Sequence, residues 1–243
     1  MTTGPPNEEF EVLWDDGEFI CSRVRHHPDR NSTLLVQAAA AHPTAASLVR
    51  LEHAYSLREE LDASWAARPM ELIDGRGKLA LRTEDPGGQV LASLLGKPWD
   101  VGPFLRAAIG LASALSGLHR RSLVHKDVKP SNLLVDVATG KAWLAGFGLT
   151  ERLAREGHAP SPPQAIAGTL AYMAPEQTGR MNRSVDTRSD LYSLGVTLYE
   201  MLTGTLPFKA SEPMEWIHCH IARQPAAPDE RLTGFPRCSR RLS

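Results

Sequence analysis

The densest group of chemically capable side chains lies in the segment HKDVKPSN, residues 125–132. Asp127 is a carboxylate that can accept a hydroxyl proton, Lys129 is a cation that can bind a phosphate, and Asn132 carries an amide oxygen that can bind a metal ion. An ordinary polar turn is the alternative interpretation. The segment follows a long amphipathic stretch and precedes two β-rich runs, so the sequence predicts a loop that presents the three side chains together.

The secondary-structure elements that would position this loop are mostly strands in the first part of the chain and mostly helices in the rest. EFEVLW, EFICSRV and TLLVQAA are predicted strands separated by turn residues, and DGRG within 71–81 predicts a hairpin. Apolar residues recur at helical spacing between Pro43 and Asp62. Further on, long helices are predicted after Asp100, a candidate cap, and up to Gly204, a candidate C-terminal stop. The order is therefore a strand-rich part, a connector, and a helix-rich part.

Composition restricts the class of protein. The 243 residues carry 27 Lys+Arg against 28 Asp+Glu, a formal net charge of −1, so no basic field for nucleic-acid binding is present. Three scattered cysteines do not make a disulfide framework, which suits a reducing compartment. The longest apolar run, 34–41, falls short of the ~20 residues of a membrane span, and the first residues do not resemble a signal peptide. We expect a cytoplasmic protein that binds neither nucleic acid nor membrane.

Two further motifs give the loop a family context. GTLAYMAPE at 168–176 and SDLYSLG at 189–195 follow HKDVKPSN in an order that resembles the eukaryotic-type Ser/Thr protein kinases. The stretch from GTLAYMAPEQTGRMNR, which begins at residue 168, to HCHIARQP, which ends at residue 225, more specifically resembles the N-terminal kinase-like domain of large bacterial signalling proteins, in which an ATPase-like module and a sensor histidine kinase follow. The resemblance implies an α+β, bilobal protein-kinase-like fold, with a small β-rich N-lobe and a helical C-lobe that lacks its last helices.

The resemblance also implies domain limits. We expect a disordered N-terminus over 1–9, the N-lobe over 10–84, an incomplete C-lobe over 85–222 and an irregular tail over 223–243. The family pattern continues with at least two more helices after residue 222, and their absence would leave apolar surface of the C-lobe uncovered. We therefore expect either a truncated or frame-disrupted piece of a longer signalling protein, or something else that covers this face.

Roles for individual residues follow from the same resemblance. Asp127 matches the aspartate that orients the substrate hydroxyl, Lys129 the lysine that neutralises the transferred phosphate, and Asn132 the metal-binding asparagine. Thr169 matches the threonine beside the catalytic aspartate. Structural roles are implied for three more residues: His125 packs the loop, Asp190 holds the loop backbone, and Glu176 pairs with an arginine of the missing helices. Lys126 stands where most of these kinases carry arginine.

The predicted nucleotide site departs from the family. Gln37 aligns with the lysine that binds the ATP phosphates, and no lysine precedes Lys78. Gly146 replaces the metal-binding aspartate in LAGFGL and has no oxygen ligand for magnesium. WDDGEFICSRV holds one glycine where a glycine-rich loop is expected.

Few neighbouring residues could replace the missing groups. Arg23 or Arg25 would be the cationic stand-in for the missing lysine, and Ala54 aligns with the glutamate that should pair with it, while Glu52 points to another face of the helix.

Two functions are compatible with these departures from the family. The first is a pseudokinase, a regulatory or interaction module in which ATP and magnesium bind weakly or not at all. The alternative is an active Ser/Thr kinase with an atypical nucleotide site. Under either function, we expect the partners of the domain to be signalling proteins.

Overall fold

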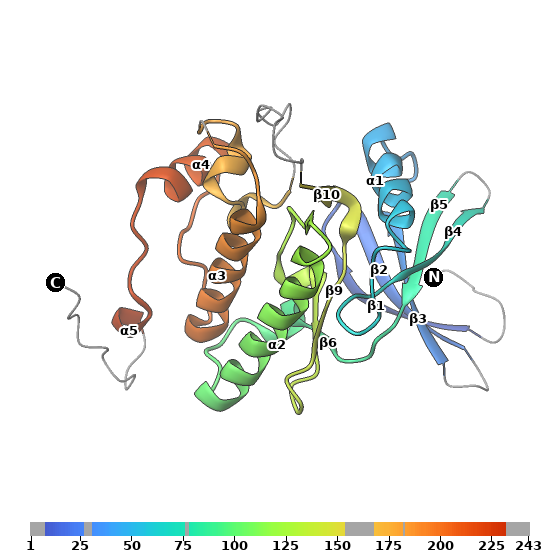
Figure 1. The fold of residues 1–243 in the computed structure, drawn as a ribbon, viewed down its shortest axis with the longest axis horizontal. Coiled ribbons are helices and arrows are strands. Elements are labelled where there is room, and N and C mark those ends of the chain that lie inside the picture. The colour runs from blue at the N-terminus through green and yellow to red at the C-terminus, as the bar shows by residue number, and fades with distance from the viewer. Residues whose placement is uncertain (1–7, 27–30, 76–77, 154–167, 182, 232–243) are drawn as a thin grey trace.

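The computed structural model describes residues 8–26, 31–75, 78–153, 168–181 and 183–231. In this part of the chain a small lobe built on a β-sheet and one helix is followed by a larger, helical lobe (Figure 1). The predicted α+β bilobal architecture is confirmed.

The small lobe is a five-stranded antiparallel sheet in the order β1-β2-β3-β5-β4. Its strands are β1 (Glu8–Asp15), β2 (Phe19–His26), β3 (Asn31–Ala38), β4 (Pro69–Gly75) and β5 (Lys78–Glu84). The predicted strands and hairpin are confirmed. Side chains alternate between the two faces of each strand, and the strand register places the buried Leu34 and Leu81 on the same face of the sheet.

One helix packs on this sheet. α1 (Ala45–Ser56) begins at Thr44, whose hydroxyl accepts a hydrogen bond from the Ser47 amide at 3.1 Å. It contacts β4, β5 and the short turn η3 (Phe147–Leu149) of the large lobe. α1 is therefore the helix that spans the boundary between the lobes.

The large lobe is organised around two long helices. They are α2 (Val101–His119) and α3 (Thr187–Thr203), followed by α4 (Pro213–Ala222) and α5 (Pro228–Arg231). Gly204 ends α3 with a left-handed φ of 72°, as its type predicts. Asp100 occupies the N-cap position of α2 but makes no side-chain capping hydrogen bond, unlike the prediction.

Short strands and turns connect the small lobe to these helices and the helices to one another. They are β6 (Gln89–Val90), η1 (Leu91–Leu94), β7 (Leu123–Val124), η2 (Pro130–Asn132), β8 (Leu133–Val135), β9 (Ala142–Leu144), β10 (Glu151–Arg152), η4 (Leu170–Tyr172) and η5 (Pro175–Thr178). α2 lies so close to the β8–β9 hairpin that a Cβ at Gly110 would sit 1.9 Å from the Gly140 carbonyl oxygen. This close packing fixes the hairpin, and with it the loop before β8.

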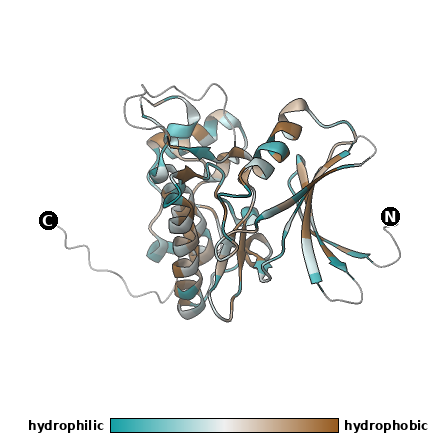
Figure 2. Cartoon of the chain, turned by 45° about the vertical axis from the view of Figure 1, so that its right-hand side comes forward, coloured by the Kyte–Doolittle hydropathy of each residue, from teal (hydrophilic) through white to brown (hydrophobic). Residues whose placement is uncertain are grey.

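α2 is long and apolar enough to cross a membrane by length and composition alone, with a mean hydropathy of 1.4. It nevertheless packs against α3 and β9, and Leu111, Leu115 and Leu118 are buried in the core. Figure 2 shows hydrophobic and hydrophilic residues interspersed along the helices and strands, as amphipathic packing requires. We therefore assign α2 to the core of the large lobe.

The ends of the described chain refine the predicted limits. β1 begins at Glu8, inside the expected disordered segment 1–9, and the first seven residues lie outside the described part. α5 is a short helix within the tail that was predicted to be irregular. Three large apolar side chains of the large-lobe helices are exposed, Leu105 and Ile109 on α2 and Leu191 on α3.

Candidate functional site

The loop between β7 and β8 brings its predicted chemical residues together. The Lys129 Nζ lies 3.3 Å from the Asp127 Oδ2 and donates a hydrogen bond to the Thr169 Oγ1 at 2.9 Å. The Thr169 amide donates to the Asp127 Oδ1 at 3.2 Å. Burial disfavours the charge on Lys129, but the Asp127 and Asp16 carboxylates outweigh it and raise the pKa of this ammonium group. The Lys129 ammonium group therefore keeps its charge beside these two carboxyl groups.

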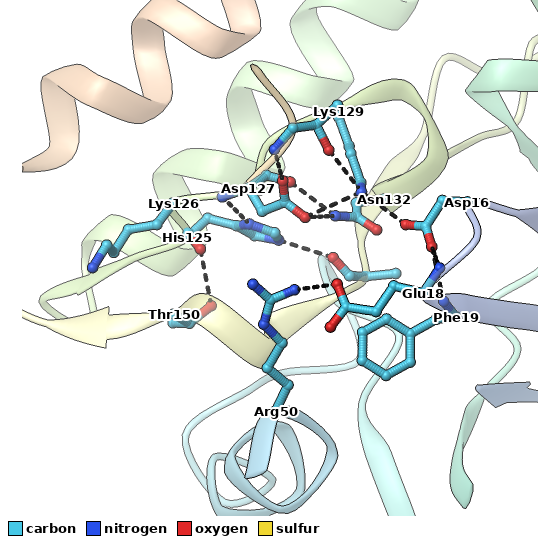
Figure 3. Close-up of polar contacts among 12 residues, drawn as sticks. Asp16, Glu18, Phe19, Arg50, His125, Lys126, Asp127, Lys129, Asn132 and Thr150 are labelled. Atoms are coloured by element: carbon cyan, nitrogen blue, oxygen red, sulfur yellow. Dashed lines mark hydrogen bonds and ion pairs between the residues drawn. The ribbon is translucent and has the colours of Figure 1, made fainter. Parts of the chain in front are cut away.

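Asn132 completes this group. Its side chain is almost fully buried, and its Nδ2 donates to the Asp127 backbone oxygen at 2.8 Å and to the Asp127 Oδ2 at 3.0 Å. Its Oδ1 faces Gly146, where an added Cβ would lie only 2.4 Å from that oxygen. Figure 3 shows Asp127, Lys129 and Asn132 converging at one point.

The backbone of this loop is held by a buried carboxylate on α3. The Asp190 Oδ2 accepts hydrogen bonds from the His125 amide at 2.8 Å and the His119 Nε2 at 2.9 Å, and its Oδ1 accepts one from the Lys126 amide at 2.8 Å. The fully buried His125 donates from one ring nitrogen to the Ala145 carbonyl oxygen, 2.8 Å away. Asp190 and His125 thus occupy the positions that the family resemblance implies for structural residues.

Glu176 and Lys126 have partners that the sequence did not indicate. The Glu176 Oε1 accepts a hydrogen bond from the Ser189 hydroxyl at 2.5 Å. The Lys126 Nζ lies 2.7 Å from the Glu151 Oε1 on β10. The lysine at the position of the family's arginine is therefore already neutralised by a carboxylate of the chain itself.

A cavity of about 500 Å³ lies between the lobes, and residues 127 and 129–132 of the loop between β7 and β8 form part of its wall. Its charged lining consists of Asp16, Glu18, Arg50, Asp127 and Lys129. Much of the remaining lining is apolar, from β2, β3, β8 and the turn η3. Such a concave, mostly apolar site with a few polar groups at one end is typical of a small-molecule site.

The prediction that Gln37 occupies the position of the phosphate-binding lysine needs correction. Gln37 is exposed and does not line the cavity, whereas its neighbours on the other face of β3, Leu34 and Val36, do. Consecutive residues of a strand point to opposite faces, so an alignment that is displaced by one residue selects the wrong side chain. The cavity-facing positions of β3 carry no charge.

The arginines considered as stand-ins are engaged elsewhere. Arg23 donates from its Nε to the Asp85 Oδ2 at 2.6 Å, and Arg25 pairs with Glu11 at 2.6 Å near the sheet surface. Ala54 is buried and lines the cavity, in agreement with its predicted place, and Glu52 is exposed.

The cation that does line the cavity beside Lys129 is Arg50 of α1, which the sequence reasoning missed. Its Nη1 lies 2.7 Å from the Glu18 Oε2. Arg50 stands four residues before Ala54, and residues four apart share a helix face. The sequence could have indicated Arg50 by this spacing, because Ala54 aligns with a residue that faces the nucleotide site.

The described residues offer magnesium an incomplete set of oxygen ligands. Asn132 and Asp127 offer oxygen atoms, but Gly146 has no side chain, and magnesium binds through oxygen ligands, usually one or two carboxylates with phosphates. No group of three or more His, Cys, Asp and Glu in the described chain could hold a metal ion.

Comparisons with known proteins agree with this architecture. A family model described as a protein kinase domain matches residues 98–234, more than half of the chain. The chain is 38% identical over 122 residues to the serine/threonine-protein kinase PknB of Mycobacterium tuberculosis, covering 50% of this chain and 19% of that protein. It is 36% identical over 124 residues to the probable serine/threonine-protein kinase SCO3848 of Streptomyces coelicolor, covering 51% and 18%. In both cases the match spans less than a fifth of the relative's length.

Proposed function

Because this chain belongs to the protein kinase domain family, we propose that it is a kinase-like signalling domain without efficient phosphoryl transfer, that is, a pseudokinase. The observation that carries the proposal is Gly146. This residue stands against Asn132, where the family needs a carboxylate for magnesium, and the contact leaves no room for a side chain unless Asn132 moves. The apolar cavity face of β3 supports the same conclusion.

Magnitudes support a near-complete loss of catalysis. Removing one preorganised group that stabilises charge in a transition state commonly costs ~3–4 kcal/mol, a ~100- to 1000-fold loss in rate. Loss of both the phosphate-binding lysine and the metal ligand would cost roughly 10⁴- to 10⁶-fold if the two effects added, although effects within one site need not add. The chain would then serve as a regulatory or interaction module.

A second candidate function is an active Ser/Thr kinase with an atypical nucleotide site. The assembled group of Asp127, Lys129 and Thr169 favours it, since Asp127 is placed to accept a hydroxyl proton and Lys129 to neutralise a phosphoryl group. The relatives are named as serine/threonine kinases. These residues also hold the loop together, so their presence supports either function.

We further propose that the domain works within a bacterial signalling system in the cytoplasm. Its proposed partners are protein modules of the kind that accompany similar domains, an ATPase-like module and a sensor histidine kinase. The bacterial source of the relatives supports this setting.

Transfer of labelled γ-phosphate from magnesium-ATP tests the proposal directly. We expect no incorporation into the chain or into a general protein substrate above that of the Asp127→Asn variant, because the metal has no carboxylate at Gly146. Circular dichroism and a denaturant titration show that both proteins are folded. Incorporation by the wild type that Asp127→Asn abolishes would overturn the pseudokinase and establish the second candidate.

A further inference from the structure

The turn between β1 and β2 forms one end of the cavity and uses its own carboxylates to satisfy its backbone. The Gly17 amide donates to the Asp15 Oδ1 at 2.9 Å, and the amides of Glu18 and Phe19 donate to the Asp16 Oδ1 at 3.1 and 2.8 Å. Free amides in such a turn are the groups that cradle an anion. Here all three are already occupied by carboxylate oxygens of the same turn.

The same turn also neutralises both cations that line the cavity among the described residues. The second oxygen of Asp16 lies 3.1 Å from the Lys129 Nζ, and Glu18 binds Arg50 at 2.7 Å (Figure 3). The Ser47 hydroxyl adds a hydrogen bond to the Glu18 Oε1 at 3.0 Å. Two residues of one turn thus bridge to the large lobe and to α1.

The ion pair with Lys129 persists at neutral pH. Burial works against the charge on Asp16, but the Phe19 amide and the Lys129 ammonium group hold the pKa of this carboxyl below its usual value. The charged lining then comprises the carboxylates of Asp16, Glu18 and Asp127 against the cations of Arg50 and Lys129. A phosphate that entered would have to displace carboxylates from both cations and would meet an excess of negative charge.

The rest of the cavity offers a different kind of surface. Buried apolar side chains from both lobes line it, contributed by Leu34, Leu81, Val90 and Leu134. Such a lining favours an uncharged ligand with a large apolar area.

We propose that the Asp16–Gly17–Glu18 turn is a built-in counter-anion that takes the place of ligand phosphates, so that the cavity selects an uncharged ligand over its phosphorylated form. This inference rests on the proposed function and deepens it, because it names the class of ligand that a kinase-like domain without phosphoryl transfer would bind. The selectivity is a property of the turn and is independent of the glycine at 146.

Isothermal titration with adenosine and with ATP, both without magnesium, measures this selectivity because the two probes share a base and differ in charge. We expect wild-type chain to bind adenosine with at least tenfold lower Kd than ATP. In the Asp16→Asn/Glu18→Gln variant the ATP Kd should fall at least tenfold, while the adenosine Kd changes little.

A matched control, Glu52→Gln/Glu59→Gln, removes the same charge from two exposed residues of α1 and the turn after it that contact neither cation, and should keep the wild-type ratio. The inference is overturned if wild-type chain binds ATP as tightly as adenosine, if the turn variant keeps the wild-type ratio, or if neither probe binds either protein. The proposed function fails instead on phosphate transfer, so the two failures are distinguishable.

Discussion

The backbone at Gly146 combines two constraints on a single residue. Its φ of 75° and ψ of 46° lie in the left-handed region, and the position of a Cβ falls 2.4 Å from the Asn132 Oδ1. Aspartate tolerates this backbone conformation better than most residues, so the contact with Asn132 is the greater obstacle to a carboxylate here. A lysine introduced at Val36, and not at Gln37, would face the same cavity.

Gly17 offers a matched comparison for this residue, because its φ is 84° but no atom lies within 4 Å of its Cβ position. We expect Gly17→Ala to lower the free energy of unfolding by about 1–2 kcal/mol, the cost of the left-handed conformation. Gly146→Ala should lower the free energy of unfolding by about 1–3 kcal/mol more than Gly17→Ala does, because its Cβ would also clash with Asn132. Urea titration at 25 °C measures both. Equal losses would show that Asn132 moves away freely.

Three elements of the large lobe meet at one histidine. His220 of α4 is buried; one of its ring nitrogens lies 2.7 Å from the Tyr192 hydroxyl on α3, and the other lies 2.8 Å from the Leu170 carbonyl oxygen in η4. Trp216 stacks on its ring, with centroids 5.9 Å apart. Burial raises the pKa of Tyr192 to about 12, so this hydroxyl stays protonated and can donate to a neutral histidine.

The burial of His220 predicts that the stability of the protein depends on pH. Burial lowers the pKa of His220 below its usual value of 6.5, and the Leu170 carbonyl offsets this only in part. The unfolded chain therefore binds the proton more readily, and the stabilisation present at pH 7 is lost as the pH falls below about 6.5. We expect His220→Gln to reduce the slope of unfolding free energy between pH 7 and pH 5, by up to ~1.4 kcal/mol per pH unit.

The exposed His218 on the same helix is the control, and His218→Gln should keep the wild-type slope. Chemical denaturation at closely spaced pH values provides the measurement. Identical slopes for the two variants would contradict the assignment to His220.

At the scale of the whole molecule, a buried ion pair ties the sheet to the connector between the lobes. The Asp85 side chain is 2% exposed, and it accepts hydrogen bonds from Arg23 of β2 and from the Ser32 hydroxyl at 2.6 Å. Arg23 also donates to the Gly88 carbonyl oxygen at 3.0 Å. Burial opposes ionisation, but the hydrogen bonds from Arg23 and Ser32 hold the pKa of Asp85 below its usual value.

We expect Asp85→Asn to lower the free energy of unfolding by about 3–5 kcal/mol, because it leaves the Arg23 guanidinium buried without a counter-charge. Glu11→Gln, which breaks the exposed pair with Arg25, should cost less than about 1 kcal/mol. Denaturant titrations of the two variants at pH 7 check the difference. Similar small losses would show that the Asp85 pair does not stabilise the attachment of the sheet to the connector.

Much of the fold and of the loop at the site was predictable because the signals are local. Asp127, Lys129 and Asn132 lie within six residues, so any turn that follows α2 brings them near each other. The strands, the hairpin and the end of α3 at Gly204 follow from residue patterns that act over a few positions. The same holds for the missing carboxylate at Gly146, which is read from a single position.

The sequence by itself therefore determined the family, the lobes and the chemistry that the loop keeps and lacks. Only the tertiary structure decided which face of β3 meets the cavity and which charges neutralise one another across it. Asp16 and Lys129 are 113 residues apart, and Glu18 and Arg50 are joined only when the sheet and α1 pack together. Such pairs depend on strand register and on the approach of the two lobes, which no local pattern of residues encodes.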